Sequence, residues 1–176
     1  PTDYAFVLCD NVFYYALVDR TNQTLFTTPT GDGIIDLSVS NVIIEENRYT
    51  YNGMVYPYRG TYTITGGTES APTENTVSVI SGEHKIVLSG AHMQAGAGSA
   101  LTLAPGVRVV LEVRGACLLR GAAYFAGVQT TGATLVLSAD SSGTLSAIGG
   151  TKAAGIGGSY EAGSPGGNGG VLIVEG

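Results

Sequence analysis

Short segments in which apolar and polar residues alternate recur along the chain. In VRVVLEVR (107–114) one side is marked by Val107, Val109, Leu111 and Val113. The segments HKIVLSG (84–90) and TLVLSA (134–139) repeat this pattern. A period of two residues is typical of a β-strand with one buried face, and no long segment has the 3.6-residue period of a helix. The pattern predicts an all-β chain with very little helix.

The alternating segments also return at a regular interval. Three units, 84–106, 107–132 and 133–158, each open with such a strand and continue through a corner, a second short strand and a Gly/Ala-rich segment. The opening strands are about 23 to 26 residues apart, which suits one turn of a parallel β-helix. A fourth unit starts at VLIVEG (171–176). The repeat predicts a right-handed parallel β-helix, a solenoid in which each turn buries its inward side chains against its neighbours.

Aromatic residues mark a boundary near residue 60. Eight of the ten tyrosines and three of the four phenylalanines lie in residues 1–62, and small residues dominate afterwards. We therefore expect a β-rich N-terminal cap or lead-in over 1–60. The β-helix is expected over 61–176, and to continue beyond Gly176 in a longer parent protein.

Three segments of the first region predict strands. DYAFVLCD (3–10) and VFYYALVDR (12–20) are β-type runs, and IIDLSVSNVII (34–44) alternates with Ile35, Leu37 and Val39 on one face. RYTYNGMVYPYRG (48–60) is typical of a hairpin, with Asn52-Gly53 as its two-residue turn.

Charge and cysteine content exclude several classes of function. The net charge is −6 and no run of Lys or Arg occurs, so we expect neither a nucleic-acid partner nor an anionic membrane surface. No apolar stretch approaches the roughly 20 residues of a membrane span. Cys9 and Cys117 lack the spacing of a metal or redox motif. Two buried thiols are the favoured interpretation of this pair, with one disulfide as the alternative.

Three charged residues of the repeats are expected on one outer face, because successive turns of a β-helix stack about 4.8 Å apart. They are Lys85, Glu112 and Arg114. Three interpretations stay open: a surface that binds an acidic sugar, the site of a polysaccharide lyase with a basic residue as proton acceptor, or a solvated face of alternating charge that discourages aggregation. The last is favoured, and no residue is assigned a catalytic or metal-binding role.

Tyrosines on both arms of the expected hairpin are the other candidate for ligand binding. They are Tyr49, Tyr51, Tyr56 and Tyr58. Facing solvent, they would form an aromatic platform for a sugar or a protein partner. Facing inward, they would cover the open end of the β-helix, which would otherwise expose core and unpaired strand edges. The cap is the favoured alternative.

Several segments together resemble a known family. TYTITGG, NTVSVISGEHKIVLSG, LTLAPGV and LVLSADSSGTLSAIGGTKAAGIGG, followed by GGNGGVLIVEG, are similar to repeats of secreted surface proteins of Gram-positive gut bacteria with right-handed β-helix modules. The resemblance covers about residues 55–176. It implies an extracellular or cell-surface location and carbohydrate binding, since some relatives bind acidic plant polysaccharides with calcium. This chain departs from the calcium-binding pattern because it has no cluster of Asp residues along its turns. We therefore expect no cofactor, with calcium, which the resemblance implies, as the alternative that the residues do not support.

These observations predict a non-catalytic extracellular module of a bacterial surface protein. It would act as an adhesin, a carbohydrate-binding scaffold or a spacer, with a polysaccharide or a host or cell-surface protein as its partner. The alternative is a self-assembling structural subunit of a filament or phage fibre, in which sheet edges of neighbouring chains pair. A polysaccharide lyase or hydrolase is the minor alternative.

Overall fold

The computed structural model describes residues 3–9, 12–18, 34–57, 60–160 and 167–175. All eighteen elements in this part of the chain are strands. The chain divides into two units, Pro1–Asp32 and Gly33–Gly176. In the first unit, β1 (Asp3–Cys9) and β2 (Val12–Val18) pair antiparallel, with Cys9 opposite Val12. This confirms the two strands expected there.

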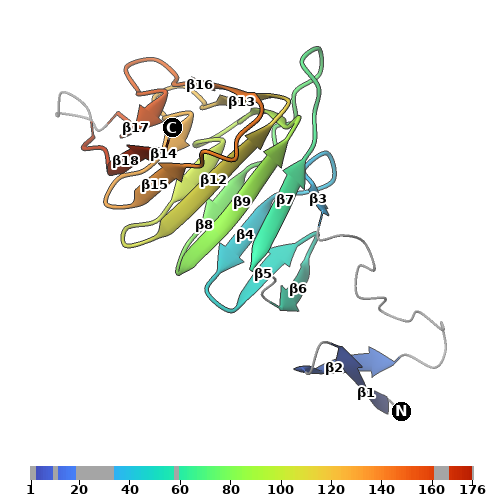
Figure 1. Ribbon diagram of the computed structural model, residues 1–176. Coiled ribbons are helices and arrows are strands. Elements are labelled where there is room, and N and C mark those ends of the chain that lie inside the picture. The colour runs from blue at the N-terminus through green and yellow to red at the C-terminus, as the bar shows by residue number, and fades with distance from the viewer. Residues whose placement is uncertain (1–2, 10–11, 19–33, 58–59, 161–166, 176) are drawn as a thin grey trace. The chain divides into compact units, whose positions relative to one another are not determined.

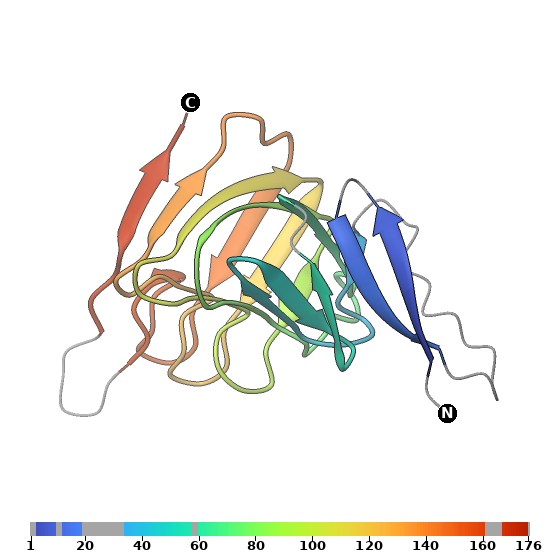
Figure 2. The ribbon, with the colours of Figure 1, turned by 90° about the horizontal axis from the view of Figure 1, so that it is seen from below.

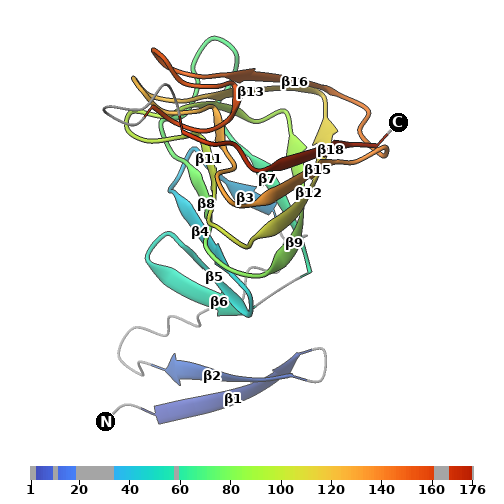
Figure 3. The same cartoon turned by 90° about the vertical axis from the view of Figure 1, so that its left-hand side faces the viewer.

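The second unit is a parallel β-solenoid of about five turns (Figures 1 and 3). Its six-stranded sheet contains β3 (Ile34–Asp36), β7 (Thr61–Thr65), β9 (Glu83–Ser89), β12 (Arg108–Arg114), β15 (Thr134–Leu137) and β18 (Val171–Val174). Its three-stranded sheet contains β10 (His92–Gln94), β13 (Ala116–Arg120) and β16 (Thr144–Ile148). Its seven-stranded sheet contains β4 (Val42–Glu45), β5 (Arg48–Tyr51), β6 (Met54–Pro57), β8 (Val77–Val79), β11 (Leu101–Leu103), β14 (Val128–Gln129) and β17 (Ile156–Gly157). The predicted parallel β-helix is confirmed.

Strands of successive turns pair in register, so that equivalent residues lie above one another in columns. Strands β9 and β12 pair along their full length, from Glu83 opposite Arg108 to Ser89 opposite Arg114. The ladder of parallel strands continues from β12 to β15 and from β15 to β18. Strands β15 (orange) and β18 (red) lie side by side in Figure 2. One inward column contains Ile86, Leu111 and Leu137, and the first two are fully buried. Stacked apolar columns of this kind form a single continuous core.

The solenoid begins earlier than the expected boundary near residue 60. Strand β3 already pairs in parallel with β7, and β4 with β8. The described aromatic residues of 34–62 therefore belong to the first turns of the coil and to the β5–β6 hairpin that extends the seven-stranded sheet. In this hairpin Tyr51 lies opposite Met54, and Asn52 and Gly53 have φ of 50° and 73°. The predicted two-residue turn is confirmed, since positive φ at both central residues is typical of type I′.

The single strand expected over 34–44 is instead two strands in different sheets. Asp36 causes the break, because its carboxylate accepts hydrogen bonds from the backbone N–H and the hydroxyl of Ser38. Ile35 and Leu37 point into the core as predicted, whereas Val39 lies on the turn and is 57% exposed. A side-chain-to-backbone turn has thus replaced the strand that alternation alone indicated.

Candidate functional site

The tyrosines of the β5–β6 hairpin face the core. The ring of Tyr49 stacks on Tyr56 at 4.9 Å between centroids and meets Tyr62 edge-on at 5.4 Å. Tyr49 is 4% exposed, and Tyr51 and Tyr56 pack partly buried against the core. The Tyr51 hydroxyl donates a hydrogen bond of 2.6 Å to the carbonyl of Asp36. This arrangement favours the cap over the platform, while Tyr58 lies outside the described residues.

The three charged residues expected on one face do come together. Lys85 Nζ lies 2.9 Å from Glu112 Oε2, and Arg114 Nε donates to Glu112 Oε1 at 2.6 Å. The Glu112 side chain is only 5% exposed, although it stands on the outer face of its strand. Asp140, on the loop after β15, adds a second carboxylate 3.6 Å from Lys85 Nζ. We call Lys85, Glu112, Arg114 and Asp140 the charged network.

Electrostatics within the charged network stabilise the charged forms of Lys85 and Glu112. Hydrogen bonds from Lys85 and Arg114 lower the pKa of Glu112, and the hydrogen bond to Glu112 raises the pKa of Lys85. A general base needs a pKa near the working pH, so a lysine stabilised as the cation is unsuited to abstract a proton. Two cations and two carboxylates also neutralise one another. The geometry favours the solvated face of alternating charge over the sugar and lyase interpretations of this location.

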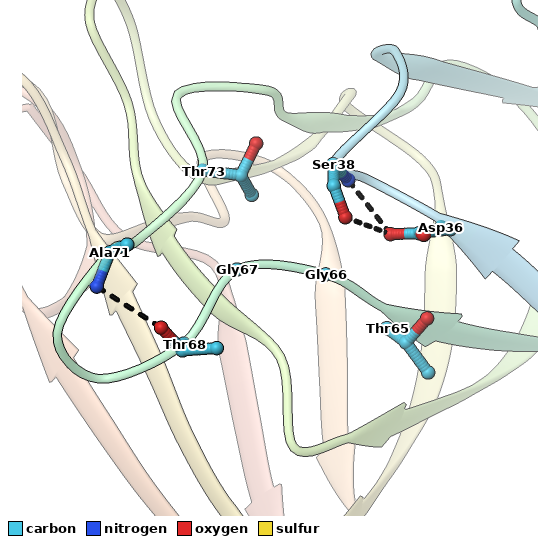
Figure 4. A pocket seen from close by; sticks show the side chains of 8 residues that line it. All are labelled: Asp36, Ser38, Thr65, Gly66, Gly67, Thr68, Ala71 and Thr73. Atoms are coloured by element: carbon cyan, nitrogen blue, oxygen red, sulfur yellow. Dashed lines mark hydrogen bonds between the residues drawn. The ribbon is translucent and has the colours of Figure 1, made fainter.

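A polar depression lies where β3 and β7 end (Figure 4). It is lined by Asp36, Ser38, Thr65, Gly66, Gly67, Thr68, Ala71 and Thr73. Most of its polar side chains hold the local corners in place. The Thr68 hydroxyl accepts from the Ala71 N–H at 3.1 Å, and the Thr73 hydroxyl donates to the Leu37 carbonyl at 2.8 Å. Hydrogen bonds from Ser38 lower the pKa of Asp36. The only carboxylate of this lining is therefore ionised and already has hydrogen-bond donors.

A cluster of aromatic side chains and one lysine was not predicted from the sequence. It lies at the corner between the three-stranded and seven-stranded sheets, where the Gly150 N–H of one turn donates to the Phe125 carbonyl of the preceding turn at 2.8 Å. Tyr124 and Phe125 are 48% and 43% exposed. The Tyr160 ring lies 5.5 Å from the Tyr124 ring, and Lys152 Nζ lies 5.1 Å from the centroid of Tyr160. We call Tyr124, Phe125, Lys152 and Tyr160 the aromatic corner.

One sequence signal did point to the aromatic corner. Tyr124, Phe125 and Tyr160 are the only aromatic residues after Tyr62 in a region otherwise rich in Gly and Ala. Tyr160, which follows β17, reaches Tyr124 through its backbone, because the Tyr160 N–H donates to the Tyr124 carbonyl at 2.8 Å. The alternating pattern of the strands does not predict this contact between Tyr160 and Tyr124.

In the described residues, no group of three or more His, Cys, Asp or Glu side chains is arranged to hold a metal ion. Within the same residues no helix is long and apolar enough to cross a membrane. Cys117 is a buried free thiol whose pKa is raised by burial, while the side chain of Cys9 lies outside the described part.

Comparison with known proteins adds no relative. No protein-family model matches the chain. No curated protein and no solved structure matches it significantly. Any assignment of function therefore rests on the fold and geometry described above and on the sequence resemblance of residues 55–176.

Proposed function

We propose that Gly33–Gly176 is a non-catalytic scaffold module of an extracellular or cell-surface protein, which either presents a binding surface or separates other parts as a spacer. The observation behind this proposal is the uninterrupted parallel ladder, with β9 and β12 in register over seven residue pairs and one apolar core behind them. A solenoid of this kind resists bending because every turn is hydrogen-bonded and packed against the next. The location rests on the resemblance of residues 55–176 to surface-protein modules.

The charged network supports the non-catalytic part of the proposal. Its four groups satisfy one another, and Lys85 is stabilised in the protonated form by Glu112. A lyase at this face would need an unprotonated base next to an open site for the uronate. Charged side chains on an outer sheet face discourage aggregation, and this is the role that we propose for the charged network.

A cleavage assay tests this function. The protein is incubated with polygalacturonate and with a neutral galactomannan, and new chain ends are measured alongside Lys85→Ala and Arg114→Ala variants. We expect no new ends from any of the three proteins. Product that forms with the original chain and disappears with Lys85→Ala would overturn the scaffold proposal in favour of a lyase.

Self-assembly is the second candidate, and β18 is the observation that favours it. All four of its apolar side chains are between 42% and 68% exposed, and in the described residues only β15 pairs with it. Light scattering after size exclusion, over a range of concentrations, separates the two candidates. The scaffold proposal predicts a constant mass. Growth with concentration that is abolished by Ile173→Lys would favour the structural subunit.

A further inference from the structure

We propose that the aromatic corner is a carbohydrate-binding site, in which the C–H face of a pyranose ring stacks on the exposed rings of Tyr124 and Phe125 while Lys152 donates hydrogen bonds to the sugar oxygens. The inference rests on the proposed scaffold function and deepens it, because it gives the scaffold a ligand class and a location for that ligand. The location differs from the hairpin tyrosines and the charged network, where the side chains are occupied with one another or with the core.

Backbone conformation at the corner is the first line of evidence. Among the described residues only three other than glycine have positive φ, namely Asn52 at 50°, Tyr124 at 70° and Lys152 at 62°. Asn52 belongs to a hairpin turn, where asparagine is the usual choice. Tyrosine and lysine are disfavoured in this conformation, and such outliers are found preferentially at functional sites.

The turn before Tyr124 has a glycine at the left-handed position of this corner. There the left-handed position is taken by Gly98, with φ of 75°, and the Gly98 carbonyl accepts from the Ala122 N–H of the next turn at 2.9 Å. In the two following turns Tyr124 and Lys152 stand at equal distances before the paired residues Val128 and Ile156. Two successive corners thus display large side chains at a position where glycine is less strained.

Chemical composition of the corner is the second, independent line of evidence. The consecutive residues Tyr124 and Phe125, both more than 40% exposed, lie at this corner, and the Tyr160 ring of a later segment lies 5.5 Å from the Tyr124 ring. Exposed tyrosine provides a large, rigid contact area that is apolar on its face and polar at its tip, as a sugar ring requires. Lys152 forms no ion pair within the described part of the chain, and an ammonium group offers three hydrogen-bond donors of the kind that sugar oxygens accept.

Other ligand classes fit the corner less well. The chain has a net charge of −6, which opposes a nucleic acid with its phosphates. A stable protein partner usually buries a surface of roughly 800 Å² on each side, whereas the aromatic corner consists of three rings and one ammonium. A small ring with polar edges and one apolar face matches this group in both size and chemistry.

The test uses the three residues with unusual backbone conformation as one matched set. Tyr124→Gly, Lys152→Gly and Asn52→Gly each replace a left-handed residue by glycine, so each is expected to fold with an unchanged or higher melting temperature. Tyr160→Ala removes the second ring of the corner without touching a left-handed position. All four variants and the original chain are screened on an array of neutral, uronate-containing and sialylated oligosaccharides, followed by calorimetry with the best binder.

We expect saturable binding to at least one glycan class, with Asn52→Gly unchanged and Tyr124→Gly and Tyr160→Ala at least ten-fold weaker. Lys152→Gly should weaken binding several-fold, and more for uronates than for neutral sugars if a carboxylate contacts the ammonium. A blank array, or binding that Tyr124→Gly and Tyr160→Ala leave unchanged, would overturn the site. Such a result with a monomer that cleaves no polysaccharide would leave the scaffold function standing, whereas cleavage would overturn that function separately.

Discussion

The backbone of Gly143 lies directly against the neighbouring turn of the solenoid. A Cβ atom at this position would lie 2.1 Å from the carbonyl oxygen of Gly115 and 2.5 Å from the backbone nitrogen of Gly115. Carbon contacts are normally about 3.5–4.0 Å long, so Gly143→Ala requires the two turns to separate by roughly 1 Å or more. The substitution therefore measures how firmly adjacent turns are held together.

The expected loss follows from the contacts at this point. Gly143 N–H donates to the Val113 carbonyl, and Thr144 N–H donates to the Gly115 carbonyl, both at 2.9 Å. Overpacking costs about 1–3 kcal/mol, and each weakened hydrogen bond about 1 kcal/mol. Alanine offsets up to about 1 kcal/mol by restricting the unfolded chain. We therefore expect the free energy of unfolding to fall by about 2–4 kcal/mol, a large part of a typical total.

Urea unfolding followed by circular dichroism measures this change, with Gly169→Ala as the matched control. The nearest atom to a Cβ at Gly169 is the Gly157 Cα at 3.5 Å, an ordinary contact, and the φ of Gly169 is outside the left-handed range. Its stability should change by less than about 1 kcal/mol. If Gly143→Ala behaved like this control, the turns could separate without cost and the ladder would not be the rigid element described above.

Three further predictions concern the core, the charged network and the thiol. Leu111→Ala should lower the free energy of unfolding by about 2–5 kcal/mol, against less than about 0.5 kcal/mol for the exposed Val55→Ala; equal losses would contradict the assigned inward face. Because the pKa of Glu112 is lowered on folding, its stabilisation is present above the unfolded value of 4.5 and lost as the pH falls through the folded value. Urea midpoints of the original chain and Glu112→Gln should therefore converge in acid, and a constant gap would refute the ion pairing. In a Cys9→Ser background, Cys117 should react with iodoacetamide slowly when folded and fully in urea, and fast native labelling would show that the thiol is accessible.

Much of the fold could be predicted from the sequence because the solenoid repeats one physical rule. Inward positions must be apolar at a period of two, and this placed residues such as Ile86 and Leu111 on the core side. Asn52-Gly53 located the hairpin because few residue pairs tolerate positive φ twice. The start of the coil was placed too late, because Asp36 forms a side-chain turn that splits an apparently regular strand, and because aromatic residues of the first turns resembled a separate cap.

The candidate sites could be predicted only where register determines them. Lys85, Glu112 and Arg114 share a face because their strands pair residue by residue. Nothing in the pattern showed that Glu112 would be buried, or that the loop after β15 would bring Asp140 to Lys85. The aromatic corner was missed for a related reason. Strand alternation does not extend into the corners, and propensity alone places glycine at a left-handed position such as that of Tyr124.

The energy balance at Tyr124 gives the stability that the fold gains from a tyrosine at this position. Relief of left-handed strain in Tyr124→Gly contributes about 1–2 kcal/mol of stability, while added chain entropy costs about 0.5–1 kcal/mol. Loss of the ring contact with Tyr160 costs about 0.5–1.5 kcal/mol more. These effects nearly cancel, so the fold gains little from tyrosine at this corner. Inward positions of a solenoid serve the core and the closest glycines allow its turns to stack, so a side chain is free to serve a ligand only at the corners and on the outer faces of the strands. A Tyr124→Gly variant that unfolds like the original chain and no longer binds glycan would separate the two roles at one residue.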